Sequence, residues 1–172
     1  PMKHRTPWSA ALLCWLLCLA LLIACGGSSA ETETAGSCTV SISCATILDN
    51  LDQLNAAKAD FVPDDGVILP ETELSFTEGE TAFDLLQRVC RDNGISMESS
   101  WSPLYKTAYI EGIANLYEFD CGKLSGWMYS VNGEFPNYGC SGYTLQDGDV
   151  ICWVYTCDLG EDVGGGYAAG GE

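Results

Sequence analysis

Residues 38–44, CTVSISC, alternate apolar and polar side chains with a period of two. This period places one set of side chains on one face of a strand, so the stretch predicts a half-buried β-strand. Residues 45–60 instead space four aliphatic side chains at helical intervals: Ile47, Leu48, Leu51 and Leu54. We therefore expect a short helix after the first strand. A turn at Pro63–Gly66 and extended segments at 67–69 and 73–76 follow it.

The clearest helical pattern lies in residues 77–94, TEGETAFDLLQRVCRDNG. Thr77 and Glu80 have the spacing of a capping box, which satisfies two backbone amides at a helix start. One face carries an apolar stripe formed by Ala82, Leu85, Leu86, Val89 and Cys90. Asn93-Gly94 predicts the end of the helix. The pattern places Cys90 on the buried face.

Only short strands are predicted after this helix. Residues 95–101 and 107–113 are two candidates, and residues 126–133, GWMYSVNG, run into an Asn-Gly pair, a strong hairpin signal. Residues 150–155 form an unbroken apolar run, which suits a central strand buried on both faces. One long helix among these strands predicts an α+β fold, a mixed sheet with the helix packed on one face.

The N-terminal residues have the composition of a secretory signal. Lys3 and Arg5 precede an apolar run from Trp8 to Ala24. The run ends in Leu22-Ile23-Ala24-Cys25, which resembles a bacterial lipobox, where the cysteine is acylated and becomes the new N-terminus. An uncleaved anchor helix is the alternative, since about 17 apolar residues can just span a bilayer. Both interpretations place the rest of the chain outside the cytoplasm, and the lipobox attaches it to the bacterial cell membrane through lipid on Cys25.

Composition divides the chain into four expected segments. These are a lipoprotein signal peptide (1–24), a flexible linker (25–37), one domain (38–160) and a Gly-rich tail (161–172). The linker is small and polar, and the tail is dominated by Gly and Ala. The domain is long enough for one hydrophobic core.

The charge of the chain excludes one class of partner. After residue 24 the sequence keeps five Lys and Arg residues against 24 Asp and Glu residues, a formal balance of −19. Such an acidic surface repels phosphate backbones, so nucleic acid is not an expected partner.

Cysteine is abundant and histidine is almost missing. Seven of the ten cysteines follow residue 25, and in an exported protein this density first indicates disulfides. Seven is an odd number, so at least one thiol is free or pairs with another chain. The sequence has no Cys-x-x-Cys pair, and its one histidine, His4, lies in the predicted signal peptide. We therefore expect no metal site.

The lack of histidine also argues against an enzyme. A Ser-His-Asp or Cys-His arrangement cannot form after residue 24, and no Gly-x-Ser-x-Gly or phosphate-binding loop is present. Two carboxylates could act on glycosides, but none of the 24 acidic residues stands out as a pair. We expect a protein that is not an enzyme and requires no cofactor.

Several motifs together resemble one known family. They are SFTEGETAFDLLQRVC, YIEGIANL, SGWMYSVNG, PNYGCSGYTLQDGDVICWVYT and DLGED. Over nearly all of residues 38–162 they are similar to the bacterial domain named after the C-terminal domain of transcobalamin. The resemblance implies a β-grasp-like fold.

The same resemblance implies a ligand. In vertebrate transcobalamin and intrinsic factor the matching domain covers cobalamin against a separate helical barrel, so cobalamin or another corrinoid is the implied ligand. The corrin-facing stretch there is similar in position to residues 127–133 here, with a second contact loop near residues 137–143. This sequence contains no pattern for a helical barrel. We therefore expect a partner protein, or a one-sided site.

The candidate ligand-binding residues are Trp127, Tyr129, Val131, Tyr138, Gly139 and Tyr143. Trp127 and Tyr129 share one face of the predicted strand. If that face is exposed beside Tyr138 and Tyr143, it offers an apolar platform for a flat macrocycle or a sugar ring. If it faces the helix, both rings are core residues, and the spacing leaves the two possibilities open.

Cys121 and Cys140 flank this region across the predicted hairpin. A disulfide between them is the first expected bridge, and it would stabilise the domain by roughly 3 kcal/mol. Cys44 with Cys90 or with Cys157 is a further pairing that the sequence leaves open.

Two functions are consistent with these patterns. The first is a membrane-anchored lipoprotein that binds a small flat ligand, a corrinoid first among them, alone or with a partner. The second is a structural or adhesive surface module that contacts protein or glycan and binds no cofactor. They differ in whether the candidate aromatic side chains are exposed together beside a concavity.

Overall fold

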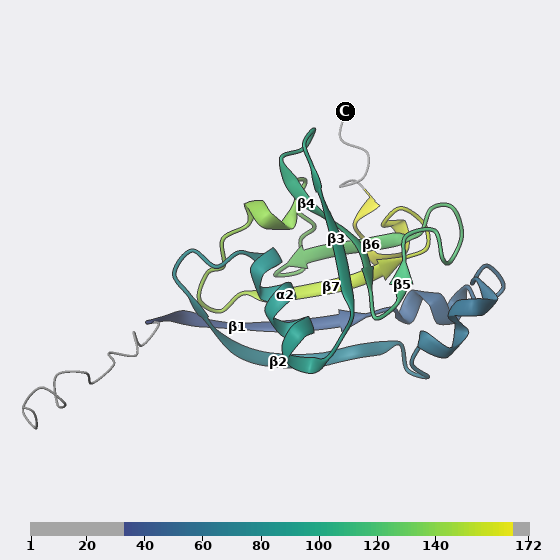
Figure 1. Cartoon of the computed structure of the whole chain (residues 1–172), viewed down its shortest axis with the longest axis horizontal. Helices are drawn as coiled ribbons and strands as arrows, with labels where there is room; N and C mark the ends of the chain where they lie inside the picture. The colour runs from purple at the N-terminus through teal and green to yellow at the C-terminus, as the bar shows by residue number, and fades with distance from the viewer. Residues whose placement is uncertain (1–32, 167–172) are drawn as a thin grey trace, which may run out of the picture. The chain divides into compact units, whose positions relative to one another are not determined.

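The structure, a computed structural model, describes residues 33–166 (Figure 1). Its strands are β1 (Thr34–Ser43), β2 (Val67–Thr77), β3 (Met97–Ser102), β4 (Thr107–Ile113), β5 (Leu116–Tyr117), β6 (Gly126–Val131) and β7 (Val150–Thr156). Its helices are α2 (Ala82–Asn93) and the short 3-10 helices η1 (Ala45–Asp49), η2 (Ala56–Phe61), η3 (Cys140–Gly142) and η4 (Glu161–Val163). The predicted signal peptide, Cys25 and residues 167–172 of the predicted tail lie outside the described residues.

The main sheet has four strands in the order β2-β1-β7-β6. β1 pairs antiparallel with β2 and parallel with β7, and β7 pairs antiparallel with β6. The alternation predicted for β1 is confirmed, because Cys38, Val40 and Ile42 are buried. The strand begins at Thr34, inside the predicted linker, because residues 34–37 pair with the end of β2.

β7 lies between β1 and β6, the central position that its apolar run predicted. Ile151, Trp153 and Tyr155 on one face are at most 2% exposed. On the other face Val150 is 37% exposed and Cys152 is half-buried. The prediction of burial on both faces is wrong, because α2 and the second sheet pack against the same face of the main sheet.

The second sheet has three antiparallel strands in the order β3-β4-β5. Figure 1 shows α2 and the β3–β4 hairpin in front of the main sheet. Ala108, Ile110 and Ile113 of β4 join the apolar stripe of α2 and the inner face of β1 and β7 in one core cluster. The predicted α+β class with one main helix is confirmed.

The stripe predicted for α2 is confirmed, since all five of its residues are at most 2% exposed. The helix begins one turn later than predicted, and its capping box is formed by Thr81 and Asp84. Glu80 instead accepts the N–H of Thr77 at 3.0 Å and pairs with Arg88 at 2.8 Å. Gly94 ends the helix in the left-handed conformation, as predicted.

The single helix predicted for residues 45–60 is wrong, because the chain forms η1 and η2 instead. The side-chain amide of Asn50 donates to the Thr46 carbonyl at 2.9 Å. The side chain of Asn55 accepts the N–H of Ala57 at 3.1 Å and starts η2. Short polar side chains compete for local backbone groups in this way and interrupt a helix.

The predicted Asn-Gly turn is present after β6. Asn132 and Gly133 have φ values of 53° and 84°, the left-handed conformation that tight hairpin turns need. Only Glu134 then pairs back, with Val131, whereas β6 pairs along its length with β7. The predicted hairpin is therefore limited to its turn.

The cysteines of the described residues are all free thiols. Cys140 and Cys90 belong to the large core cluster with α2, whereas Cys121 lies in a smaller cluster with Cys44 and Cys157. The predicted Cys121–Cys140 disulfide is not formed in the described residues, and the two side chains belong to different core clusters. The same separation argues against a Cys44–Cys90 pair.

The folded part continues beyond residue 160, the predicted end of the domain. The carboxylate of Asp162 accepts the N–H of Cys157 at 2.7 Å and a hydrogen bond from the Thr156 hydroxyl. Gly165 is buried. Within residues 33–166, no helix has both the length and the apolar composition that a membrane crossing requires.

Candidate ligand-binding cleft

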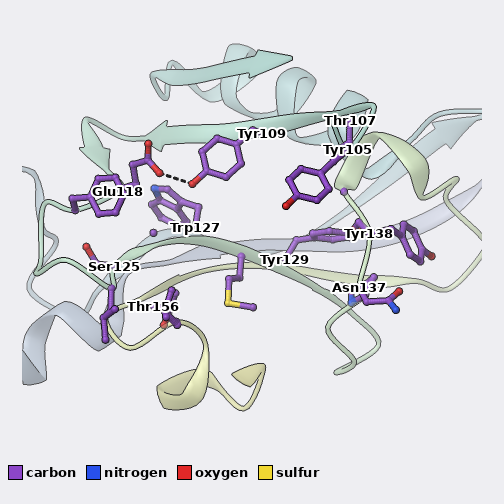
Figure 2. Close-up of a pocket in the computed structure, with 17 residues that line it drawn as sticks. Tyr105, Thr107, Tyr109, Glu118, Ser125, Trp127, Tyr129, Asn137, Tyr138 and Thr156 are labelled. Carbon is purple, nitrogen blue, oxygen red and sulfur yellow. Dashed lines mark hydrogen bonds between the residues drawn. The ribbon is translucent and has the colours of Figure 1, made fainter. Parts of the chain in front are cut away.

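A cleft of about 570 Å³ lies between β6, β4 and the loop before η3 (Figure 2). It is lined by Tyr105, Thr107, Tyr109, Glu118, Phe119, Leu124, Ser125, Gly126, Trp127, Met128, Tyr129, Pro136, Asn137, Tyr138, Gly139, Thr156 and Leu159. Six of these side chains are aromatic. The volume falls within the range of roughly 300–1,000 Å³ that small-molecule sites occupy.

Trp127 and Tyr129 form the β6 side of the cleft. They stand opposite Tyr155 and Trp153 in the sheet register and therefore face the core. The indole N–H of Trp127 donates to the Leu116 carbonyl at 2.8 Å, and its ring meets Tyr155 edge-on, with centroids 5.2 Å apart. Tyr129 stacks on Trp153 at 5.5 Å and is 8% exposed. Tyr129 is thus a buried core side chain and Trp127 a half-buried one packed against the core, and both also line the cleft.

Side chains from the second sheet form the opposite wall. Figure 2 shows Tyr105 and Tyr109 projecting from the β4 side towards β6. The Tyr109 hydroxyl donates to the Glu118 carboxylate. Burial and this bond raise the pKa of Tyr109 to about 12. Phe119, the residue after Glu118, also lines the cleft and is 63% exposed. Its backbone is left-handed, with a φ of 67°.

The loop before η3 closes one end of the cleft. Tyr138 is 50% exposed, and its carbonyl accepts the Tyr129 hydroxyl at 2.9 Å. A β-carbon on Gly139 would lie 1.9 Å from the Thr107 hydroxyl oxygen and 2.5 Å from the Thr107 β-carbon. The Thr107 hydroxyl shares a 2.8 Å hydrogen bond with that of Ser141. Glycine at 139 is therefore required for the loop to lie this close to β4.

Four of the six predicted site residues, Trp127, Tyr129, Tyr138 and Gly139, meet at this cleft. Val131 does not line it, because it is buried in the core at the end of β6. Tyr143 does not line it either. That side chain packs against the core and donates its hydroxyl to Asp149 at 2.8 Å. Burial and this bond raise the pKa of Tyr143 to about 12.

Sequence reasoning missed the wall formed by Tyr105, Tyr109 and Phe119. A signal for Tyr109 was present, because residues 107–113 alternate and put it on the face away from Ala108 and Ile110. No comparable signal existed for Phe119. Its position depends on a left-handed backbone and on the bond from its N–H to the Ser125 carbonyl at 3.1 Å.

The lining carries little charge. Glu118 is its one carboxylate, and no Lys, Arg or His lines the cleft. The tyrosines with raised pKa values stay neutral at physiological pH, and burial raises the pKa of Tyr129 as well. Residues 33–166 contain no group of three or more His, Cys, Asp or Glu side chains that could hold a metal ion. The site suits a neutral or weakly cationic ligand with large apolar faces.

Comparison with known proteins gives three results. Residues 79–157 match the family model described as a domain of unknown function, DUF4430. Among solved structures, haptocorrin in complex with Cbi is similar over 78% of this chain, with 17% identity and a TM-score of 0.46, and this chain spans 29% of that one. A candidate metal-binding protein from Ruminococcus gnavus is similar over 70% of this chain and 96% of its own, with 17% identity and a TM-score of 0.39. No curated protein matches the sequence.

Proposed function

We propose that this chain is an extracytoplasmic, lipid-anchored protein whose aromatic cleft binds a small flat ligand, with corrinoids as the first candidates. The observation that carries the proposal is the cleft of about 570 Å³ with six aromatic side chains in its lining. The motif resemblance to the transcobalamin C-terminal domain supports the choice of corrinoid. We also propose the β-grasp assignment, which the order β2-β1-β7-β6 with a parallel β1–β7 pair supports.

The rim of the cleft suits a ligand that is covered on one face only. Tyr105 is 76% exposed, Phe119 63% and Tyr138 50%, so these rings have free surface to contact a macrocycle. With no histidine in residues 33–166, a bound cobalt would keep an axial ligand of its own. Recognition would rest on apolar area and backbone hydrogen bonds, and a partner protein would cover the other face.

We propose a binding role rather than a catalytic one. The carboxylate of Glu118 is the one acidic group in the lining, and it is occupied by the hydroxyl of Tyr109. Acid–base chemistry needs a group that can exchange a proton with a substrate near neutral pH. A phenol whose pKa is raised to about 12 does not meet that condition.

Titration with cyanocobalamin tests the ligand. The titration uses the Trp101→Phe variant, which lacks the exposed indole outside the cleft. We expect cyanocobalamin to quench its tryptophan fluorescence in a saturable way, and equilibrium dialysis to give a matching amount of bound cyanocobalamin. Tyr138→Ala should weaken binding roughly 3–10-fold, because one aromatic contact is worth about 0.5–1.5 kcal/mol. Phe61→Ala is the matched control, an aromatic side chain 43% exposed on η2, and should bind like the parent. No saturable binding, with or without a candidate partner, would remove corrinoids from consideration.

A second function is favoured by apolar side chains beyond the cleft. Trp101 and Leu104 on the β3–β4 hairpin are 63% and 79% exposed and do not line it. Exposed apolar patches often mark contacts with other macromolecules. A structural or adhesive surface module that binds protein or glycan, with no cofactor, would show a flat cyanocobalamin titration and would lose partner binding in Trp101→Ala.

The lipid anchor has its own test. In cells that express the full-length precursor and are fed radioactive palmitate, we expect label on the processed protein, because Cys25, the cysteine of the lipobox motif, would carry the acyl chains. Cys25→Ala should remain at precursor size and unlabelled. Cys18→Ala, in the same apolar run, is the matched control and should be labelled like the parent. Label that persists in Cys25→Ala would contradict the anchor.

A further inference from the structure

Three of the seven described thiols belong to the smaller of the two core clusters. Cys44 and Cys121 are completely buried and Cys157 is 7% exposed, and they pack with Leu116 and Tyr155. The sulfur of Cys121 lies 3.3 Å from the Asn50 carbonyl. None of these thiols lines the cleft described above. These three thiols are therefore not part of the proposed ligand site.

The register of the main sheet brings Cys121 and Cys157 to the same place. Gly126 pairs with Thr156 at the end of the antiparallel strands β6 and β7. The next residue outward on each strand is Ser125 on one side and Cys157 on the other. The N–H of Cys121 donates to the Ser125 hydroxyl at 3.1 Å, which places Cys121 against the start of β6.

A second bond fixes the two segments beyond the sheet. The N–H of Leu159 donates to the carbonyl of Leu124 at 3.0 Å, so the loop after Cys157 runs beside the loop after Cys121. Burial is the main cause that raises the pKa of Cys157 to about 12, and the neighbouring thiol of Cys121 is the next. Hydrogen bonds on both sides of the two cysteines thus hold their backbone segments next to each other.

Cys44 is placed differently within the cluster. Its N–H donates to the Gly66 carbonyl at 2.7 Å, on the side of the loop that leads into β2. Burial raises the pKa of Cys44 to about 11, and its acidic neighbour is Asp65 rather than another thiol. Cys44 is therefore the third thiol of the cluster and does not belong to the Cys121–Cys157 pair.

We propose that Cys121 and Cys157 form a disulfide when the chain folds in the presence of a disulfide oxidant, leaving Cys44 as a buried thiol beside it. The bond would close the segment 121–157, which contains β6, the Asn-Gly turn, the loop before η3 and β7. That segment supplies the β6 side and one end of the cleft. A chain outside the cytoplasm meets such an oxidant, so this proposal rests on the proposed export of the chain. It does not depend on the proposed ligand.

The chemistry is thiol–disulfide exchange. The thiolate of one cysteine attacks a sulfur of the oxidant, which forms a mixed disulfide and releases one oxidant thiol. The thiolate of the other cysteine then attacks the mixed disulfide and releases the second oxidant thiol. The two protein thiols are oxidised, the oxidant disulfide is reduced, and the two protons end on the released thiols. Thiolates are the reacting species, so burial makes the folded, reduced protein slow to react. The bond should form during folding.

Peptide mapping tests the pairing. The full chain is refolded from denaturant in mild detergent with oxidised and reduced glutathione, alkylated, and digested without reductant. We expect one cross-linked peptide pair that contains Cys121 and Cys157, with Cys44 and Cys90 alkylated only after the chain is denatured. A pair that contains Cys44, or complete alkylation of Cys121 and Cys157 in the denatured oxidised chain, would overturn the proposal.

Thermal unfolding separates the bond from simple packing. Cys121→Ala and Cys157→Ala each leave a cavity, which lowers Tm in oxidised and reduced protein alike. Losing the disulfide should lower Tm further, by roughly 10 °C for a closed loop of about 37 residues, and only in the oxidised protein. Cys90→Ala, a buried thiol of the other cluster, is the control and should lower Tm equally in both states. Equal losses for Cys121→Ala in both states would contradict the proposal. Because neither measurement uses a ligand, a flat cyanocobalamin titration leaves its outcome unchanged.

Discussion

Asp149→Ala is expected to lower the free energy of unfolding by about 1.5–3 kcal/mol, the range for hydrogen bonds to a charged group, because its buried carboxylate is the shared acceptor of three bonds. Asp149 is only 4% exposed and lies between the Asn-Gly turn and β7. Its carboxylate accepts the Gln146 N–H and the Tyr143 hydroxyl at 2.8 Å each, and the Asn132 amide at 3.0 Å. Alanine leaves these three donors without their acceptor.

Equilibrium unfolding in urea measures this loss, with the midpoint and the slope fitted together. Asp147→Ala is the matched control, because this exposed carboxylate lies two residues away and accepts one bond, from the Ser37 N–H at 2.9 Å. We expect the control to lose no more than about 1 kcal/mol. Equal losses for the two variants would show that the buried network contributes nothing beyond a surface turn.

Trp153→Ala is expected to cost about 3–5 kcal/mol, as other buried tryptophan and phenylalanine truncations do. Trp153 is 2% exposed on the inner face of β7, and Tyr129 stacks on it beneath the cleft. The truncation should therefore also release Tyr129 and weaken any ligand bound above it. Urea unfolding measures the first effect, and the cyanocobalamin titration measures the second in variants that remain folded.

Trp153→Phe sharpens this prediction. The indole N–H of Trp153 has no hydrogen-bond partner within the described part of the chain. An unpaired buried donor costs about 1–3 kcal/mol, so phenylalanine removes a penalty while it leaves a smaller cavity. We expect Trp153→Phe to lose under half of what Trp153→Ala loses. Trp101→Ala, at a site 63% exposed, should stay within about 0.5 kcal/mol of the parent. Similar losses for Trp153→Phe and Trp153→Ala would contradict this account.

The elements that the sequence predicts well are those specified by their own side-chain period. The alternation of β1 and the stripe of α2 each require one buried face, and the structure buries those faces. The interval 45–60 had an equally regular aliphatic spacing. In that interval, hydrogen bonds between the Asn50 and Asn55 side chains and nearby backbone groups split the expected helix into two short 3-10 helices. The spacing of apolar residues carries no information about such bonds.

The candidate site was predicted in part for a similar reason. Trp127, Tyr129, Tyr138 and Gly139 lie in or near β6, the segment that the motif resemblance marked. Tyr143 lies in the same stretch, but its hydroxyl is bonded to Asp149 and turned away from the cleft. The opposite wall comes from β4 and Phe119, and their approach to β6 is a tertiary contact with no local signature.

The position of β7 has a consequence for how the chain matures. β7, the last strand of residues 33–166, is the one that joins β1 to β6, so the main sheet is not continuous until residue 156 is in place. Contacts between the two ends of a chain close the longest loops and form late in folding. A chain truncated before β7 would therefore leave β1 and β6 without the strand that joins them, so the β2–β1 pair and β6 would remain separate pieces of the main sheet.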